Sequence, residues 1–268
     1  MTGKQFVLFI DDLTARQVLH GILTMPGDKA FTENVRNLLA TYQNDLAADP
    51  LLSCLMDVKT LRPFLDVVLE NVLTFKLNVC ELEASESSVY RHIVQQLADQ
   101  PKLHVKVTAA DSKLPQGEDF DSLDVTPKEW DFSREAAELG KFHLVVLNNV
   151  LHRQHSAAEA VAKAAQLVED GGFLLVQEVT RNFPVYLAME GLHKDLPLQA
   201  SENGTAYGRY RSPSVWRELF SSAGLEVVMH TSDGYLSSLF LLRHKMTEVN
   251  MLFYLCVGCC ACGWDFEG

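Results

Sequence analysis

Two side chains of complementary chemistry follow separate apolar runs of the sequence. His152 comes shortly after the run at 142–147, and Glu178 lies near the end of the run at 173–179. The interval between them is long enough for one helix that connects adjacent parallel strands. A carboxylate that orients an imidazole can form a general base able to remove a proton from an acidic carbon. The alternative is structural: His152 would be a satisfied residue at a helix start, and Glu178 a surface acid at a strand end.

The turn after the first expected parallel strand is where a nucleotide-type cofactor would bind. Glycines in that turn let the backbone approach the ligand and direct N–H groups at it. Such a turn can be written as an acidic residue followed by glycines at alternate positions. If Glu81 is that acidic residue, the three glycine positions are 83, 85 and 87, and they hold Glu83, Ser85 and Ser87. Glu83 and Glu86 also add negative charge where a cofactor carboxylate would lie. The sequence therefore predicts a compromised cofactor turn.

Two further acids could contact a nucleotide. Asp111 follows the second expected strand, where an acid can hold ribose hydroxyls, and Asp131 could meet an adenine amino group. Each taken alone is more typical of a solvated loop acid. The body of the chain has no Cys/His cluster with ligand spacing, so no metal site is expected there.

Four cysteines gather near the end of the chain, at Cys256, Cys259, Cys260 and Cys262. Soft-metal binding and lipidation are open alternatives for them. The C-x₂-C-C-x-C spacing is crowded for a tetrahedral zinc site. We favour the interpretation that this tail has no bearing on the domain before it.

The elements that would position these residues alternate between strands and helices from residue 76 onward. A strand-like piece at 5–10 comes first, and helices are expected at 12–23, 32–47, 60–73, 87–97, 157–168 and 213–223. Strands are expected at 77–82, 103–108, 123–125, 142–147, 173–179, 225–229 and 237–242. The last two are close enough for a hairpin. This order predicts a doubly wound α/β sheet with a final antiparallel strand.

The same pattern divides the chain into three parts. A helical lead-in is expected over 1–75, an α/β domain over 76–244, and a cysteine-rich tail over 245–268. In this sheet type, ligands bind beyond the carboxyl ends of the strands, where the strand order reverses. His152 would stand at the mouth of that cleft.

Composition and charge narrow the function classes. The 268 residues are 47% hydrophobic and 22% charged, which excludes a disordered tail, a collagen-like fibre and a polytopic membrane protein. The net charge of -12 argues against nucleic acid as a partner. The apolar run at 6–10 is too short for a signal peptide or a membrane span, so a cytoplasmic location is the default expectation.

Several segments of the chain resemble the methyltransferase-like domain of animal fatty acid synthase. The resemblance covers about residues 48–244 and rests on segments 49–57, 69–72, 76–81, 88–93, 171–175 and 237–243. It implies a Rossmann-like class I methyltransferase sheet. It also implies a cytosolic multidomain enzyme, in which ketosynthase, acyltransferase, dehydratase and reductase domains are the neighbours and an acyl carrier protein is a further partner.

In the animal synthase this domain is a catalytically silent pseudo-methyltransferase. Its active relatives, the C-methyltransferase domains of polyketide synthases, use S-adenosylmethionine to methylate the α-carbon of a carrier-bound β-ketoacyl chain. They pair a histidine in an Asn-Val-Leu-His-like motif with a glutamate on the following strand, which the resemblance assigns here to His152 and Glu178. The expected function is a structural, non-catalytic domain without cofactor. The alternative is an active C-methyltransferase that binds S-adenosylmethionine through Glu81, Asp111 and Asp131.

Overall fold

The computed structural model describes the α/β part of the chain. The described residues are 58–72, 75–84, 89–100, 102–113, 120, 123–180, 210–232 and 237–245, with the isolated positions 21, 34 and 37. The expected strand-like piece at 5–10 and the tail cysteines lie outside these residues. The expected helices at 12–23 and 32–47 lie largely outside them too. The three-part division of the chain therefore stays a prediction.

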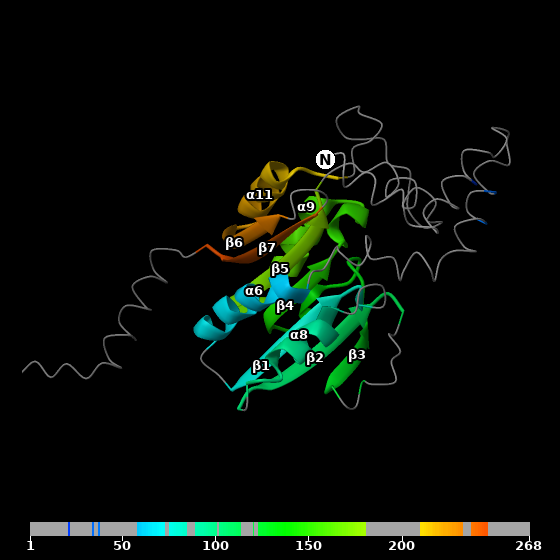
Figure 1. Cartoon of the computed structure of the whole chain (residues 1–268). Coiled ribbons are helices and arrows are strands. Elements are labelled where there is room, and N and C mark those ends of the chain that lie inside the picture. Colours follow the sequence, from blue (N-terminus) through cyan, green and yellow to red (C-terminus); the bar gives the residue numbers. More distant parts are fainter. Residues whose placement is uncertain are drawn as a thin grey trace, which may run out of the picture.

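Seven strands form one sheet within the described residues, in the order β3-β2-β1-β4-β5-β7-β6 (Figure 1). Their bounds are β1 Lys76–Leu82, β2 His104–Asp111, β3 Val125–Glu129, β4 Phe142–Asn148, β5 Val168–Val179, β6 Leu225–Ser232 and β7 Ser237–His244. Strands β1 to β5 pair in parallel, and β7 runs antiparallel to both β5 and β6. This confirms the predicted doubly wound α/β sheet with a final antiparallel strand.

The strand order reverses between β1 and β4. From β1 the chain proceeds outward through β2 to β3, and it then returns to place β4 and β5 on the other side of β1. In open sheets of this class the reversal opens the crevice in which ligands bind, beyond the carboxyl ends of the strands. Glu81 and Leu82 pair with Val146 and Leu147 there, so the ends of β1 and β4 are direct neighbours.

Most expected elements differ from the structure by a few residues in their bounds, and two of these differences have a clear physical cause. The strand expected at 123–125 is β3, which begins at Val125 and extends to Glu129. Among the described strands it pairs only with β2, at the edge of the sheet, and an edge tolerates the polar residues and the proline of this segment. The helix expected to continue to residue 168 ends at Leu167, because Val168 already pairs with Phe142 of β4. A shift in register then follows, and Gly171 adopts a φ of 79° within it.

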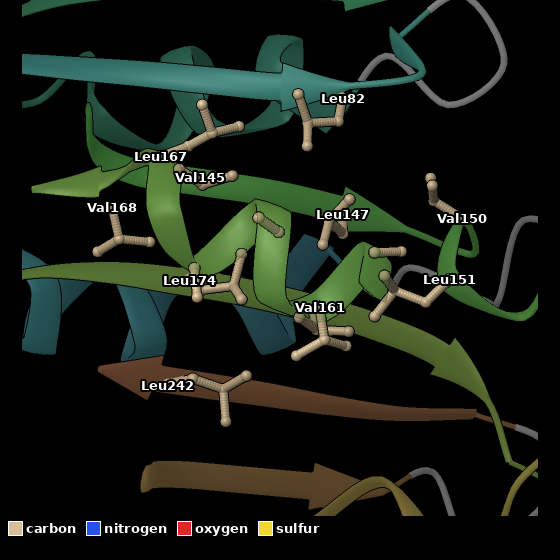
Figure 2. Packing of buried hydrophobic residues seen from close by; sticks show 14 of the residues in the cluster. Leu82, Val145, Leu147, Val150, Leu151, Val161, Leu167, Val168, Leu174 and Leu242 are labelled. Atoms are coloured by element: carbon tan, nitrogen blue, oxygen red, sulfur yellow. The ribbon is translucent and has the colours of Figure 1, made fainter. Parts of the chain in front are cut away.

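Helices cover both faces of the sheet (Figure 1). Helices α9 Ala157–Leu167 and α11 Pro213–Ser222 pack on one face, and α6 Val58–Asn71 and α8 Val89–Leu97 pack on the other. Val145 and Leu147 of β4 contribute to the first core cluster, part of which is drawn in Figure 2, whereas Leu144 and Val146 contribute to the second. This alternation follows from the two-residue period of a strand, and burial on both faces explains the continuous apolar runs. In the part of the chain described, none of the helices has both the length and the apolar character that crossing a membrane requires.

A substitution at Gly172 tests the close approach of β5 to β4. A Cβ atom placed there would lie 2.9 Å from the carbonyl oxygen of His143, 3.0 Å from that of Phe142 and 3.1 Å from that of Glu169. All three are backbone atoms, which yield little. We expect Gly172→Ala to lower the free energy of unfolding by about 2 kcal/mol in urea titrations.

Gly224→Asn is the matched control for that substitution. Gly224 has a φ of +78° but open space around its Cβ position, and asparagine tolerates this conformation. Its free energy of unfolding should fall by less than about 1 kcal/mol. An unchanged stability of Gly172→Ala would contradict the tight packing described here.

Candidate functional site

The carboxyl edge of the sheet gathers most of the candidate residues. Glu81 lies near the end of β1 and Glu83 directly follows that strand, while Asp111 ends β2. His152 lies in the 3₁₀ helix η3, Leu151–Arg153, which follows β4, and Glu178 lies near the end of β5. The structure therefore places all five residues at the edge where the strand order reverses.

His152 and Glu178 form a buried pair. The Nδ1 atom of His152 lies 2.6 Å from Oε2 of Glu178, and both side chains are 0% exposed. The other carboxylate oxygen, Oε1, accepts a hydrogen bond from the Leu151 N–H at 2.7 Å. Each oxygen of Glu178 thus has its own donor in η3. Glu178 is a buried residue, so the alternative of a surface acid at a strand end is wrong.

The backbone of Asn149 brings η3 over the end of β5. Asn149 has a φ of 56°, in the left-handed region that asparagine enters more readily than most residues. Its N–H donates to the carbonyl oxygen of Gln177 at 2.8 Å, which extends the pairing of β4 with β5 by one step. The chain then turns sharply into η3, so that His152 faces the strand beside its own.

The geometry of the pair defines what the imidazole can do. A carboxylate only accepts hydrogen bonds, so Nδ1 of His152 carries the proton and Nε2 is the basic nitrogen of the neutral ring. This is the arrangement of an oriented general base. The ring is also enclosed: His152 as a whole residue is only 3% exposed, and the centroid of the Tyr210 ring lies 5.2 Å from that of the imidazole.

Glu81 is used to cap a helix. Its Oε1 accepts from the N–H of Val89 at 2.9 Å, and its Oε2 accepts from the N–H of Tyr90 at 2.8 Å. These N–H groups begin α8, where a negative charge is favoured by the helix dipole. A buried carboxylate with both oxygens bound in this way stabilises the junction between β1 and α8. It holds the helix terminus with a group of the chain itself.

Glu83 occupies the position at which the first glycine of a cofactor turn was expected. Its φ is 54°, the left-handed conformation that glycine adopts without strain and that costs other residues about 1 kcal/mol or more. Its Oε1 accepts a hydrogen bond from Nε2 of Gln154 at 2.6 Å. Burial raises the pKa of the Glu83 carboxyl, and the negative charge of Asp111 raises it further, against the opposing effects of Gln154, Arg153 and His152.

The described residues of this turn, Glu81 and Glu83, do not fit S-adenosylmethionine. At residue 83 the backbone has the left-handed conformation that favours glycine, but the residue there is a glutamate. Its carboxylate accepts a hydrogen bond from Gln154, on the far side of the point where the strand order reverses. The N–H groups that open α8 are bound by Glu81. Ser85 and Ser87 lie outside the described residues.

Asp111 and Asp131 mainly bind their own loops. Oδ1 of Asp111 accepts from the hydroxyl of Ser112 at 3.1 Å and from the N–H of Lys113 at 3.3 Å. Oδ1 of Asp131 accepts from the N–H of Ser133 at 2.7 Å and from the Ser133 hydroxyl, and these bonds lower the pKa of Asp131. Asp111 is close enough to Glu83 to act on its charge, whereas Asp131 closes a local turn. Among the described residues, no group of three or more His, Cys, Asp or Glu side chains is arranged to hold a metal ion.

Two residues of the site were missed by the sequence reasoning. Gln154 stands two positions after His152, and its polar side chain so close to the motif was a weak signal for it. Tyr210 reaches the His152 ring from a distant part of the sequence, and no periodic pattern connects the two.

Removal of the His152 ring tests how much the buried pair contributes to the free energy of unfolding. His152→Ala leaves the buried Glu178 carboxylate with only the Leu151 N–H as donor among the contacts described above, so we expect the free energy of unfolding to fall by about 3 kcal/mol. Urea or thermal unfolding of the full chain measures it. The control is His104→Ala, whose ion pair with Asp124 has side chains that are 60% and 45% exposed. That control should change the free energy of unfolding by less than about 0.5 kcal/mol. Equal losses in the two variants would contradict the larger contribution of the buried pair to stability.

The raised pKa of Glu83 predicts a pH dependence of stability. The folded chain binds a proton at Glu83 more readily than the unfolded chain, so this residue contributes to stability at low pH. This contribution is lost as the pH rises above 4.5, the ordinary pKa of a glutamate. Glu83→Gln stays neutral. The stability of this variant relative to the wild type should therefore increase as pH rises from about 4.5 to 7 in urea titrations.

An exposed glutamate provides the control for that pH series. Glu218 lies on the exposed side of α11. Glu218→Gln therefore removes one negative charge, as Glu83→Gln does, but from an exposed position. Its stability difference from the wild type should be independent of pH over the same range. A flat difference for Glu83→Gln as well would contradict the burial of the Glu83 charge.

Comparison with known proteins agrees with this fold. A family model described as a methyltransferase domain matches residues 66–230. The highly reducing polyketide synthase FUM1 of Gibberella moniliformis is 29% identical over 116 residues, which are 43% of this chain and 4% of that synthase. The chain thus spans only a small part of the curated relative that it matches.

Solved structures with the same fold include carbon methyltransferases. The CMeT domain of the citrinin polyketide synthase has a TM-score of 0.60 at 16% identity, over 85% of this chain and 60% of that one. The CurJ carbon methyltransferase has a TM-score of 0.61 at 14% identity, over 91% and 70%. The trans-methyltransferase CalH, solved with SAH, has a TM-score of 0.56 at 18% identity, over 86% and 72%. The chain therefore belongs to the methyltransferase domain family and is related to the C-methyltransferase domains of polyketide synthases.

Proposed function

We propose that this chain is a fragment of a fatty acid synthase-like multidomain enzyme and that its methyltransferase-fold domain is structural and does not transfer methyl groups. The observation that carries the proposal is Glu83, which holds the left-handed position of the first turn glycine and fills that place with a bound carboxylate. A turn that must receive a donor needs open backbone there. The resemblance of separate segments to the pseudo-methyltransferase of animal fatty acid synthase supports the same function.

The proposal includes a place in a larger protein. The domain would extend over 76–244, after a helical lead-in at 1–75 and before an unmatched tail at 245–268. Its partners would be neighbouring synthase domains and an acyl carrier protein, in the cytoplasm. The match to a short part of a polyketide synthase supports a modular context of this kind.

An active C-methyltransferase is the second candidate, and the His152–Glu178 pair is the observation that favours it. An imidazole oriented through Nδ1 by a buried carboxylate suits proton removal from the α-carbon of a β-ketoacyl thioester. In that case Glu81, Asp111 and Asp131 would contact the methyl donor. Their present hydrogen bonds to α8 and to their own loops argue for the first candidate.

Titration with the methyl donor separates the two candidates. We expect isothermal titration calorimetry of the full chain to detect no binding of S-adenosylmethionine or S-adenosylhomocysteine at ligand concentrations up to about 1 mM. CalH, which was solved with SAH, is the positive control for the ligand solution. Binding tighter than about 100 μM would overturn the structural function.

A product assay completes this test. The chain is incubated with S-adenosylmethionine and a β-ketoacyl thioester, and mass spectrometry then searches for a product that has gained one methyl group. We expect none. Formation of that product by the wild type, with its loss in His152→Ala, would establish the second candidate.

A further inference from the structure

The Glu83 side chain spans the point where the strand order reverses. It leaves the chain directly after β1, in the left-handed conformation, and its Oε1 accepts from Nε2 of Gln154 at 2.6 Å. Gln154 directly follows η3, which itself follows β4. One hydrogen bond therefore connects the segments that follow the two strands between which this sheet class places its ligands.

The surroundings show that the Glu83 carboxylate lies among the charged groups of the site. Arg153 of η3 and Asp111, which ends β2, both act electrostatically on Glu83. Glu83 is half-buried, and its carboxylate is bound at this edge of the sheet by Gln154. A ligand that approached this turn would meet a negative charge already bound there.

We propose that Glu83 is the residue that excludes a methyl donor from this turn. Its carboxylate occupies the place that the donor's amino-acid carboxylate would take, and the hydrogen bond from Gln154 holds it there. The proposal rests on the structural function proposed above and names the group responsible for it. A donor that carries the amino-acid part would have to break the bond to Gln154 and move Glu83 aside. A ligand without that part would not be affected.

Two ligands with the same nucleoside test this exclusion. S-adenosylhomocysteine carries the amino-acid part, and 5′-methylthioadenosine lacks it. Both are titrated calorimetrically into the full chain as wild type, Glu83→Gly and the control Glu218→Gln. Glu83→Gly removes the side chain and suits the φ of 54°, so we expect it to bind S-adenosylhomocysteine at least about tenfold more tightly than the wild type. The affinity for 5′-methylthioadenosine should stay within about twofold in all variants.

A second variant keeps the test independent of the backbone change. Gln154→Ala removes only the anchor of Glu83, and we expect it to increase affinity for S-adenosylhomocysteine in the same direction, by about threefold. Thermal unfolding of each variant verifies that it is folded. Glu218→Gln lowers the net negative charge by the same amount as Glu83→Gly and should bind as weakly as the wild type.

The outcomes distinguish this inference from the function on which it rests. Binding of S-adenosylhomocysteine by the wild type below about 100 μM would overturn both. No binding by the wild type and no gain in folded Glu83→Gly and Gln154→Ala would overturn the role of Glu83 and leave the structural function in place. An equal gain for 5′-methylthioadenosine would also overturn it, because the substitution would then have opened the turn generally.

Discussion

The buried carboxylate of Glu178 is the group on which the carboxyl edge of the sheet depends. A carboxylate removed from water must have donors for both oxygens, since an unpaired buried charge costs several kcal/mol. Glu178 cannot move to find them, because β5 is paired with β4 on one side and with β7 on the other. The donors must therefore come to it, and both come from η3. The left-handed turn at Asn149 and the placement of His152 follow from this requirement.

The rest of the edge continues the same principle. Gln154 leaves η3 beside the end of β1 and binds Glu83, while Glu81 binds the first N–H groups of α8. Each of these carboxylates is satisfied by a group of the chain itself. A ligand site works in the opposite way, since it keeps donors unoccupied and oriented until the ligand arrives. The carboxylates of this edge are thus used to support the fold, and the donors that bind them are occupied.

The sheet could be predicted from the sequence to the extent that its strands are buried on both faces. The segments at 142–147 and 173–179 are continuous apolar runs because β4 and β5 have helices above and below them. The bounds of β3 could not be read in this way, because an edge strand with one partner tolerates polar residues and Pro127. The contact of Glu83 with Gln154 was also beyond the sequence, since it depends on two separate turns, one at φ 54° and one through η3. The spacing of His152 and Glu178 allowed their pairing, because it fits one helix crossover between adjacent strands, and the family resemblance favoured it.

A second pair of the same residue types shows why position in the sheet matters more than the pair itself. His143 lies near the amino end of β4, where its Nδ1 accepts from the Asn78 N–H at 3.0 Å and its Nε2 lies 2.9 Å from Glu169. Both of its nitrogens join β1, β4 and β5 together, which is a purely structural use of an imidazole and a carboxylate. His152 and Glu178 make a comparable contact at the opposite edge of the same strands. The described part of the chain thus has a histidine–glutamate pair at each edge of these strands, and of the two only the one beside the reversal of strand order has the location that proton transfer to a ligand would require.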